Sequence, residues 1–272
     1  MQKVHVIVFA IILLLALFFL FPFYVAILMS LKTTQETFLS FYSIPKGLHL
    51  DNYIHAWNTS NYSKAIVNSL IITVGAVFLI IAVSSLAGYS IARRKGWYYQ
   101  AVYLLFLAGL MVPFQVTMLP VYKLGKTLHM INTHWGIILL YGGAGVQLAV
   151  FFYAGFIKAI SRELEEAARM DGCSVLGTFF RIIFPLLKPV TATMMIINAL
   201  YIWNDFLLPL LYLQNPKFRT IPLQQYYFFG QYSSDLNLAF AYAVMGMIPI
   251  IAFFLLMQKY IIKGISAGAI KG

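Results

Sequence analysis

The 272-residue sequence has little charge, few acidic residues and a single cysteine. Charged residues make up 10% of the chain and hydrophobic residues 61%, whereas a soluble domain carries roughly 25% charge. A chain this apolar is typical of membrane proteins that cross the bilayer several times. The one cysteine, Cys173, excludes an internal disulfide and has no neighbouring metal-ligating residues.

The motifs of the common enzyme classes are also missing. The sequence contains no GxxxxGK[ST] phosphate loop, so this chain cannot bind ATP in the P-loop manner. Its five histidines form no HExxH pair. No nucleophile is placed beside a base in a pattern that indicates a triad. We therefore predict a protein that is not an enzyme, with no catalytic residue, no metal and no cofactor of its own.

Basic residues outnumber acidic ones by 19 to 8. In a soluble protein this excess would suggest a nucleic-acid partner, but in an apolar chain Lys and Arg set membrane topology. If both termini lie inside, the inner segments hold twelve of the 19 basic residues and the longer outer loops hold the rest. This asymmetry predicts cytoplasmic termini, a cytoplasmic loop between the fourth and fifth spans, and no nucleic-acid partner.

Long apolar runs predict an all-α, polytopic membrane protein with six transmembrane helices in one domain, residues 1–272. Each run has the roughly 20 residues that a bilayer core requires. The first is longer than a signal-peptide core and lacks a small-residue cleavage site, so we expect it to be retained. The spans are expected at about residues 4–31, 65–92, 97–119, 135–157, 190–213 and 239–262, with a polar loop at 158–189 and a tail at 263–272.

The polar loop is predicted to form two short helices joined by a turn. Ser161 can cap the first helix, which has glutamates near its start and Arg169 near its end, as the helix dipole favours. Gly172 ends that helix. Ser174 can start the second, which is expected to end at Pro185, since proline disfavours its continuation.

The residues of this loop resemble the EAA loop of membrane subunits in bacterial ABC importers. Residues 166–168 read E-A-A, Gly172 follows at the family spacing, and Ile182 and Pro185 lie beyond it. Phe184 stands where the family pattern usually has leucine, a change that keeps bulk and apolarity. The resemblance implies a cytoplasmic coupling loop, in which Glu166 meets a basic residue of an ATPase and transmits its closure to the fourth and fifth spans. The implied coupling residues are Glu165, Glu166, Ala167, Ala168, Asp171, Gly172 and Pro185.

Further short matches extend the resemblance over nearly the whole chain, to the carbohydrate (maltose and multiple-sugar) branch of these permeases. They are Pro22-Phe23, Ser30-Leu31-Lys32, Asn68-Ser69-Leu70, Trp203-Asn204-Asp205-Phe206 and the glycine-rich tail.

The resemblance implies a bacterial cell membrane protein with three kinds of protein partner: a second, homologous permease, two copies of a cytosolic ATPase subunit, and an extracytoplasmic sugar-binding protein. ATP and Mg would bind to the ATPase subunits. The cargo implied is a sugar, with a glycerol phosphate or polyol as an alternative. A proton-coupled secondary transporter is disfavoured, because the spans contain one acid and no inverted repeat is evident.

Asp205 is the only carboxylate in a predicted span. It lies sixteen residues after Pro189, about 24 Å along a helix at 1.5 Å per residue, which places it in the outer half of the membrane. Intramembrane acids usually face a cavity or a partner, and neighbouring aromatic and amide groups suit the ring faces and hydroxyls of a sugar. The alternative is an interfacial aromatic belt, with Asp205 solvated or bonded to backbone near Pro209. The translocation-path candidates are Gln147, Tyr201, Trp203, Asn204 and Asp205.

Two further segments are expected to meet partners. The aromatic run from Tyr226 to Phe229 lies in the outer loop 214–238, where it would contact the sugar-binding protein or form an aromatic belt in the headgroup layer. The contact residues expected are Gln225, Tyr226, Tyr227 and Gln231. By resemblance, the tail should insert between the two ATPase subunits through Ser266, Ala267, Gly268 and Lys271.

Overall fold

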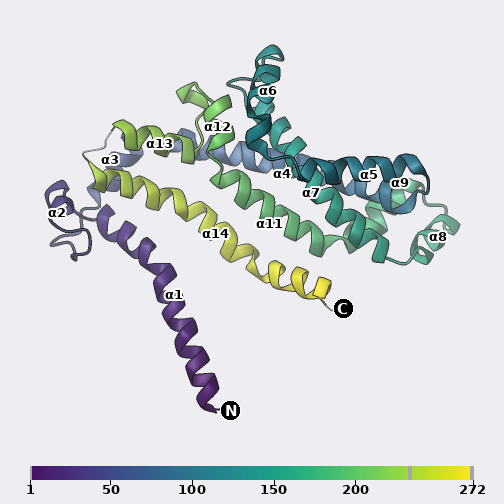
Figure 1. Ribbon diagram of the computed structural model, residues 1–272, viewed down its shortest axis with the longest axis horizontal. Coiled ribbons are helices and arrows are strands. Elements are labelled where there is room, and N and C mark those ends of the chain that lie inside the picture. Colours follow the sequence, from purple (N-terminus) through teal and green to yellow (C-terminus); the bar gives the residue numbers. More distant parts are fainter. Residues whose placement is uncertain (1, 232–234, 270–272) are drawn as a thin grey trace. The chain divides into compact units, whose positions relative to one another are not determined.

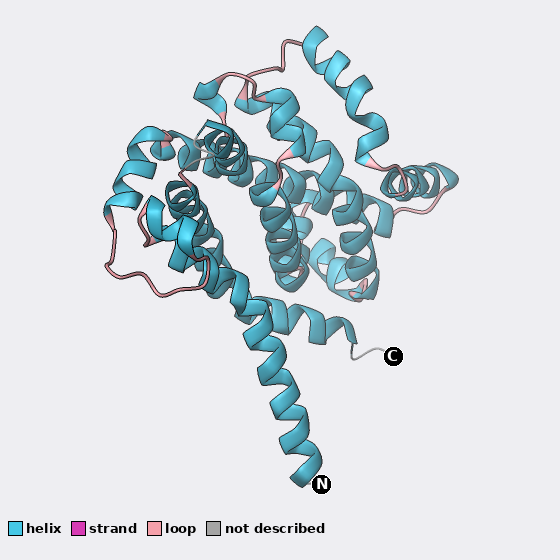
Figure 2. Cartoon of the chain, turned by 60° about the vertical axis from the view of Figure 1, so that its left-hand side comes forward, coloured by secondary structure: helices cyan, strands magenta, loops and turns pink. Residues whose placement is uncertain are grey.

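The computed structural model describes residues 2–231 and 235–269, and within these ranges every regular element is a helix (Figures 1 and 2). The chain divides into two compact units, which are described separately. The first comprises Met1–Ala65 and Ile221–Ile251, and the second comprises Ile66–Thr220 and Ala252–Gly272. The predicted all-α fold class is confirmed.

Four of the described helices are long and apolar enough to cross a membrane, or up to six if each of two bent helix pairs counts as one span. The chain is therefore a polytopic membrane protein. The four helices are α1 (Gln2–Ser30), α4 (Tyr62–Arg93), α7 (His134–Ala159) and α14 (Leu236–Ala269).

The third predicted span is interrupted. Helix α5 (Trp97–Leu110) ends before residue 119, and α6 (Phe114–Thr127) leaves it at an angle of 105°. Pro113 stands at the N-cap of α6. Because proline has no N–H and disfavours helical geometry in the preceding residue, a continuous helix is not expected here. The loop predicted after residue 119 therefore begins within helix α6, which continues to Thr127.

The fifth predicted span is also broken. Helix α11 (Lys188–Asn204) has Pro189 in its first turn, as the sequence predicts. The backbone is extended at Asp205, and a separate short helix, α12 (Leu207–Tyr212), follows. The continuous helix expected over residues 190–213 thus ends at Asn204.

Glycine allows α4 and α7 to pack closely in the second unit. A Cβ added at Gly88 of α4 would lie 2.7 Å from the Cβ of Tyr153 in α7, and one at Gly145 of α7 would lie 2.4 Å from Ile80 of α4. Real Cβ atoms do not approach so closely, because packed interiors leave no such space. Helix α7 stays helical through its glycine-rich stretch, which serves close packing rather than unwinding.

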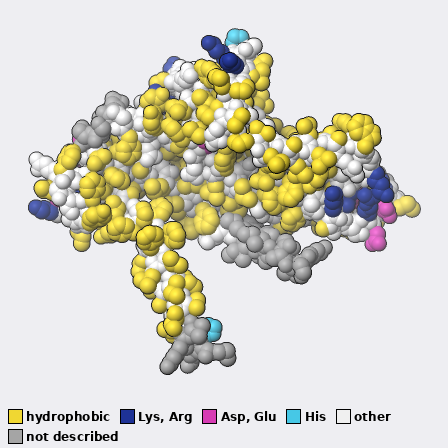
Figure 3. All heavy atoms as spheres, viewed as in Figure 1, with side chains coloured by type: hydrophobic (Ala, Val, Ile, Leu, Met, Phe, Trp, Pro, Cys, Tyr) yellow, Lys and Arg dark blue, Asp and Glu magenta, His cyan; other side chains and the backbone are white. Residues whose placement is uncertain are grey.

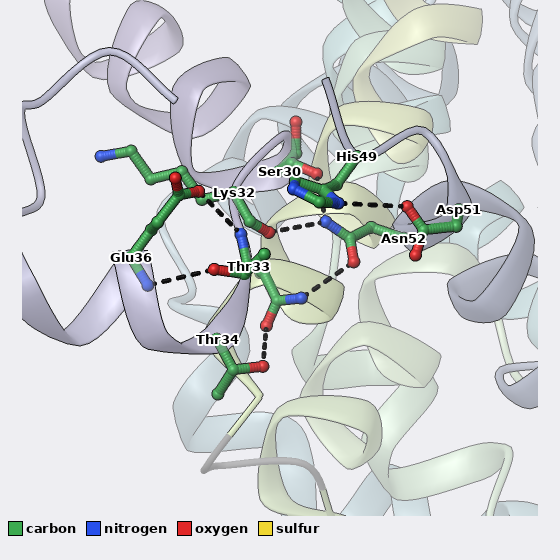
Figure 4. Close-up of polar contacts among 9 residues, drawn as sticks. Ser30, Lys32, Thr33, Thr34, Glu36, His49, Asp51 and Asn52 are labelled. Carbon is green, nitrogen blue, oxygen red and sulfur yellow. Dashed lines mark hydrogen bonds and ion pairs between the residues drawn. The ribbon is translucent and has the colours of Figure 1, made fainter. Parts of the chain in front are cut away.

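A network of neutral side chains joins four helices of the first unit (Figure 4). The buried Asn52 of α3 (Asp51–Thr59) donates to the carbonyls of Ser30 and Lys32, both at 2.9 Å. Asn237, at the start of α14, donates to Oδ1 of Asn52 at 2.9 Å. Thr34 of α2 (Thr34–Leu39) donates to Oδ1 of Asn237 at 3.2 Å. The ends of α1, α2, α3 and α14 are thereby held together.

Charged side chains beside this network form hydrogen bonds with backbone groups. The Lys32 side chain is fully buried and donates from Nζ to the carbonyl of Ser40 at 2.7 Å, and burial lowers its pKa. Glu36 and Thr33 form a capping box at the start of α2. The backbone N–H groups of Thr33 and Lys46 donate to the Glu36 carboxylate and lower its pKa.

Candidate functional site

The polar loop contains a short helix, α8 (Glu163–Met170), that is fastened to the end of α4. Glu165 of α8 is only 5% exposed. Its carboxylate accepts one hydrogen bond from the Tyr89 hydroxyl at 2.9 Å and another, charge-assisted, from Nε of Arg93 at 2.5 Å. Arg93 also donates from Nη2 to the carbonyl of Ile160 at 2.9 Å. Both ends of this ion pair are therefore satisfied inside the chain.

The second helical stretch of the loop rests on the same tyrosine. Ser174 caps α9 (Val175–Thr178) by accepting from the Gly177 N–H, as predicted. The chain continues as a π-helix, Phe179–Ile183, and then as α10 (Phe184–Leu186). Phe179 is buried, with its ring centroid 5.2 Å from that of Tyr89. Tyr89 thus supports both halves of the loop.

The turn between the two halves is formed by Gly172. Its φ of +82° lies in the left-handed region that favours glycine and ends α8 as the sequence predicts. The next residue, Cys173, donates its N–H to the carbonyl of Ala168 at 2.9 Å. The second helical stretch ends at Leu186, one residue beyond the predicted Pro185, and α11 begins after a bend of 75°.

The predicted coupling residues divide between two faces of the loop. Glu165 and Ala168, two of the implied coupling residues, are buried within the chain itself. Two large apolar residues of α8 are exposed: Leu164 is 46% exposed and Met170 88% exposed, and Met170 lies one turn after the exposed acid Glu166 on the same face. The remaining predicted residues, Glu166, Ala167, Asp171, Gly172 and Pro185, are all exposed.

Charge gathers at this end of the second unit. In the space-filling view, dark blue Lys and Arg side chains and magenta acids lie together near α8, on the right-hand side (Figure 3). A small open hollow of about 110 Å³ is lined there by Arg93, Arg162, Glu165, Glu166 and Arg169. Glu166 therefore lines this hollow together with three arginines of its own chain.

Asp205 is held by groups of its own chain. Its Oδ2 accepts a hydrogen bond from the Tyr141 hydroxyl at 2.8 Å, and its Oδ1 accepts from the Leu207 N–H at 3.1 Å. Tyr201 is 55% exposed, with its ring centroid 6.5 Å from that of Tyr141. The carboxylate therefore organises the break between α11 and α12, which agrees with the backbone-bonded alternative. Asn204 is exposed and donates to the carbonyl of Leu200 at 2.8 Å.

The other translocation-path candidates do not join this cluster. Trp203 is only 5% exposed and lies in the chain's interior. Gln147 lies on α7 beside Gly109 of α5, where a glycine makes room for its amide. A role for Tyr141 was not predicted from the sequence. The only sequence feature that pointed to it was its position directly before the glycine-rich stretch of α7.

The aromatic run of the outer loop lies on a helix, α13 (Ile221–Gln231). Phe228 is 2% exposed and stacks on Tyr242 with ring centroids 5.5 Å apart. The expectation that the whole run needs an external surface is therefore wrong for Phe228, which packs in the core of the first unit. Tyr226 is 56% exposed and Tyr227 36% exposed. Gln225 is partly exposed, and the side chain of Gln231 lies outside the described residues.

The predicted tail continues α14 as helix to Ala269. Ser266, Ala267 and Gly268 lie in its last turns, and their side-chain surroundings, like the whole of Lys271, lie outside the described residues. Among the residues that the structure describes, no group of three His, Cys, Asp or Glu side chains could hold a metal ion.

Comparisons with known proteins identify the family of this fold and loop. The family described as "Binding-protein-dependent transport system inner membrane component" matches residues 81–267. The chain is 39% identical to the probable starch degradation products transport system permease protein of Thermoanaerobacterium thermosulfurigenes, over 100% of both chains. It is also 39% identical to the melibiose/raffinose/stachyose import permease protein of Bacillus subtilis, over 92% of this chain and 91% of that one.

A solved structure shares the fold. A chain of a bacterial ABC transporter involved in the import of the acidic polysaccharide alginate superposes with a TM-score of 0.81, covering 95% of this chain and 97% of that chain at 23% identity. Family members of this kind are transport components rather than enzymes. The chain therefore belongs to the family of binding-protein-dependent transport system inner membrane components.

Proposed function

We propose that this chain is a permease subunit of an ATP-driven importer and that it forms half of a sugar translocation path. The observation that carries the proposal is the two-faced helix α8. One side is locked to α4 through Glu165, and another presents Glu166 and, one turn later, Met170 outward. An exposed apolar and acidic helix face on a short, firmly held element fits a docking site for another protein.

The partner that we propose for this face is a cytosolic ATPase subunit, present in two copies beside a second, homologous permease. The excess of Lys and Arg on the α8 side supports a cytoplasmic position with both termini inside. ATP and Mg would be held by the ATPase. Closure of that partner would push on α8, and the buried Glu165–Arg93 pair would pass the displacement to α4 as well as to the flanking α7 and α11.

The way in which both halves of the loop are joined to α4 suits alternating access. Tyr89 contacts both halves of the loop, through its hydrogen bond to Glu165 and its ring contact with Phe179. A push on either half therefore reaches the same end of α4. Because α4 packs on α7 through glycine contacts, a shift of α4 requires α7 to move with it.

The cargo that we propose is a sugar, an oligosaccharide in particular, delivered by an extracytoplasmic binding protein. The names of the two sequence relatives support this class. Within the chain, the exposed ring of Tyr201 and the exposed amide of Asn204 offer an apolar face and a hydrogen-bonding group beside the fixed Asp205. Exposed Tyr226 and Tyr227 on α13 are the side chains that we propose meet the binding protein.

Reconstitution tests the proposal. The chain, its companion permease and the ATPase are placed in proteoliposomes with the binding protein, and uptake of radiolabelled maltotriose and raffinose is measured with and without ATP. We expect uptake that needs both ATP and binding protein, and its loss in Glu166→Ala. Uptake driven by a proton gradient without ATP would refute the proposal.

A photoreactive group at Gln225 should capture the binding protein during turnover, whereas capture of lipid alone would refute that contact.

A further inference from the structure

A second cavity lies near α8, where the end of α4, the start of α5 and the end of α7 meet. Its volume is about 350 Å³. That volume is within the range of small-molecule sites. Four cations line it, Arg94, Lys95, Lys158 and Arg162, and no carboxylate does.

Two of these cations are held in place by aromatic rings. Arg94 donates from Nη1 to the Tyr99 hydroxyl at 2.8 Å, and its guanidinium carbon lies 5.7 Å from the centroid of the same ring. Nζ of Lys158 lies 5.4 Å from the centroid of Tyr103. Rings position a cation without neutralising it, so the positive charge remains available to a ligand.

Within the described residues, none of these four cations forms an ion pair, although Arg162 also lines the neighbouring hollow that contains Glu165 and Glu166. The ion pair found at this end joins Arg93 to Glu165, and neither of them lines the cavity. The start of α5 adds to the positive field. Its N-cap, Gly96, lines the cavity and supplies no side chain to the free N–H groups of the first turn. The ligand expected from these groups is an anion of the phosphate class.

The surroundings indicate that the anion belongs to a lipid. The cavity opens at the end of membrane-crossing helices, and Trp97 and Tyr98 beside it are 80% and 60% exposed, as side chains of the membrane interface are. Farther along α5, Leu104 and Leu105 are 62% and 72% exposed. Acyl chains lying along α5 would cover these two leucines while the headgroup phosphate occupies the cavity.

We infer that the cavity between α4, α5 and α7 binds the headgroup of an anionic phospholipid, such as phosphatidylglycerol, with its acyl chains along α5. Basic pockets between membrane helices on the cytoplasmic side bind such headgroups in the same way. In the orientation proposed above, the lipid belongs to the cytoplasmic leaflet. The inference does not rest on the nature of the cargo.

Native mass spectrometry of the full chain in detergent tests the inference, with dioleoyl phosphatidylglycerol and dioleoyl phosphatidylcholine as probes. We expect phosphatidylglycerol to bind preferentially. The double variant Arg94→Gln/Lys158→Gln should bind it about 25-fold more weakly, from about fivefold for each lost charge near the membrane surface. The charge-conserving variant Arg94→Lys/Lys158→Arg should retain binding. Equal phosphatidylglycerol binding by the double variant and the unmodified chain would overturn the inference.

A matched control removes the same charge elsewhere. Lys123 and Lys126 are exposed on α6, away from the cavity lining, so Lys123→Gln/Lys126→Gln should leave phosphatidylglycerol binding unchanged. If both double variants lost phosphatidylglycerol binding equally, net charge alone would explain the loss, and the proposed site would be wrong.

Two further outcomes separate a lipid from other anions. Stabilisation of the chain against heat by inorganic phosphate, as large as that by phosphatidylglycerol, would identify a soluble anion instead. In the assembled importer, a photoreactive group at Gln100, which lines the cavity, should capture phosphatidylglycerol. Capture of the ATPase instead would show that a protein covers the cavity and would refute the proposed lipid site.

Discussion

Two polar clusters secure this protein, and they use different chemistry. In the first unit, Asn52 and Asn237 join helix ends through neutral amide hydrogen bonds. In the second, a buried ion pair between Arg93 and Glu165 fastens α8 to α4. The difference lies in what a single substitution does. Loss of an amide leaves unpartnered neutral groups, whereas loss of one ion strands a buried charge, which costs more than the intact pair contributes.

The largest expected effect is that of Glu165→Ala. It leaves the guanidinium of Arg93 buried without its partner, at a cost of about 4 kcal/mol to the docking of α8. Because Cys173 is the only cysteine and its N–H donates to the carbonyl of Ala168 in α8, its rate of maleimide labelling reports release of the helix. We expect faster labelling and a loss of ATP-coupled uptake.

Glu166→Ala is the matched control, one residue away on the exposed face of the same helix. It should abolish coupling while leaving Cys173 labelling unchanged. Similar labelling rates in the two variants would show that Glu165 does not anchor α8.

The second prediction concerns the amide network. Asn52→Ala removes the hydrogen-bond partner of the Ser30 and Lys32 carbonyls and of the Asn237 amide, at a cost of about 2–3 kcal/mol. We expect a lower thermal unfolding midpoint without a change in Cys173 labelling. Asn58→Ala, at an exposed position of the same helix, should change neither. Faster Cys173 labelling in Asn52→Ala, as expected for Glu165→Ala, would remove the distinction between the two clusters.

A third prediction asks whether close helix packing holds the ionic anchor in place. The Cβ of Gly88→Ala would meet Tyr153 at 2.7 Å and the backbone nitrogen of Ala154 at 3.1 Å, so α4 must shift, at about 1–2 kcal/mol. Cys173 labelling should rise moderately. Gly143→Ala on α7 meets nothing within 4 Å and should have no such effect. If both alanines behave alike, helix propensity rather than packing is responsible.

The smallest effect is expected from Glu36, the acid beside the amide network. Its pKa is lowered in the folded chain below the ordinary value of 4.5, so its contribution is present above that value and is lost as the pH falls through the folded pKa. The unfolding midpoint of the unmodified chain should exceed that of Glu36→Gln at pH 7, and the gap should narrow below pH 4.5. A gap independent of pH would contradict the assignment.

Composition and pattern were sufficient to predict the all-α membrane fold and the local form of the polar loop. Long apolar runs must cross a bilayer, and a Gly172 turn and a Ser174 cap act on the residues next to them. The positions of Pro113 and Asp205 did not reveal the helix breaks, because proline occurs both within membrane helices and at their ends, and the carboxylate acts through Tyr141, 64 residues away.

Sequence alone also did not separate Glu165 from Glu166. Adjacent helical residues point about 100° apart, so Glu165 and Glu166 have different surroundings, but periodicity does not say which face of α8 meets α4. The tertiary structure decides this by bringing Tyr89 and Arg93 to Glu165 across more than 70 residues of chain. The same packing places Arg94 and Lys158 around one cavity. In sequence these are scattered basic residues, and only the meeting of α4, α5 and α7 concentrates their charge.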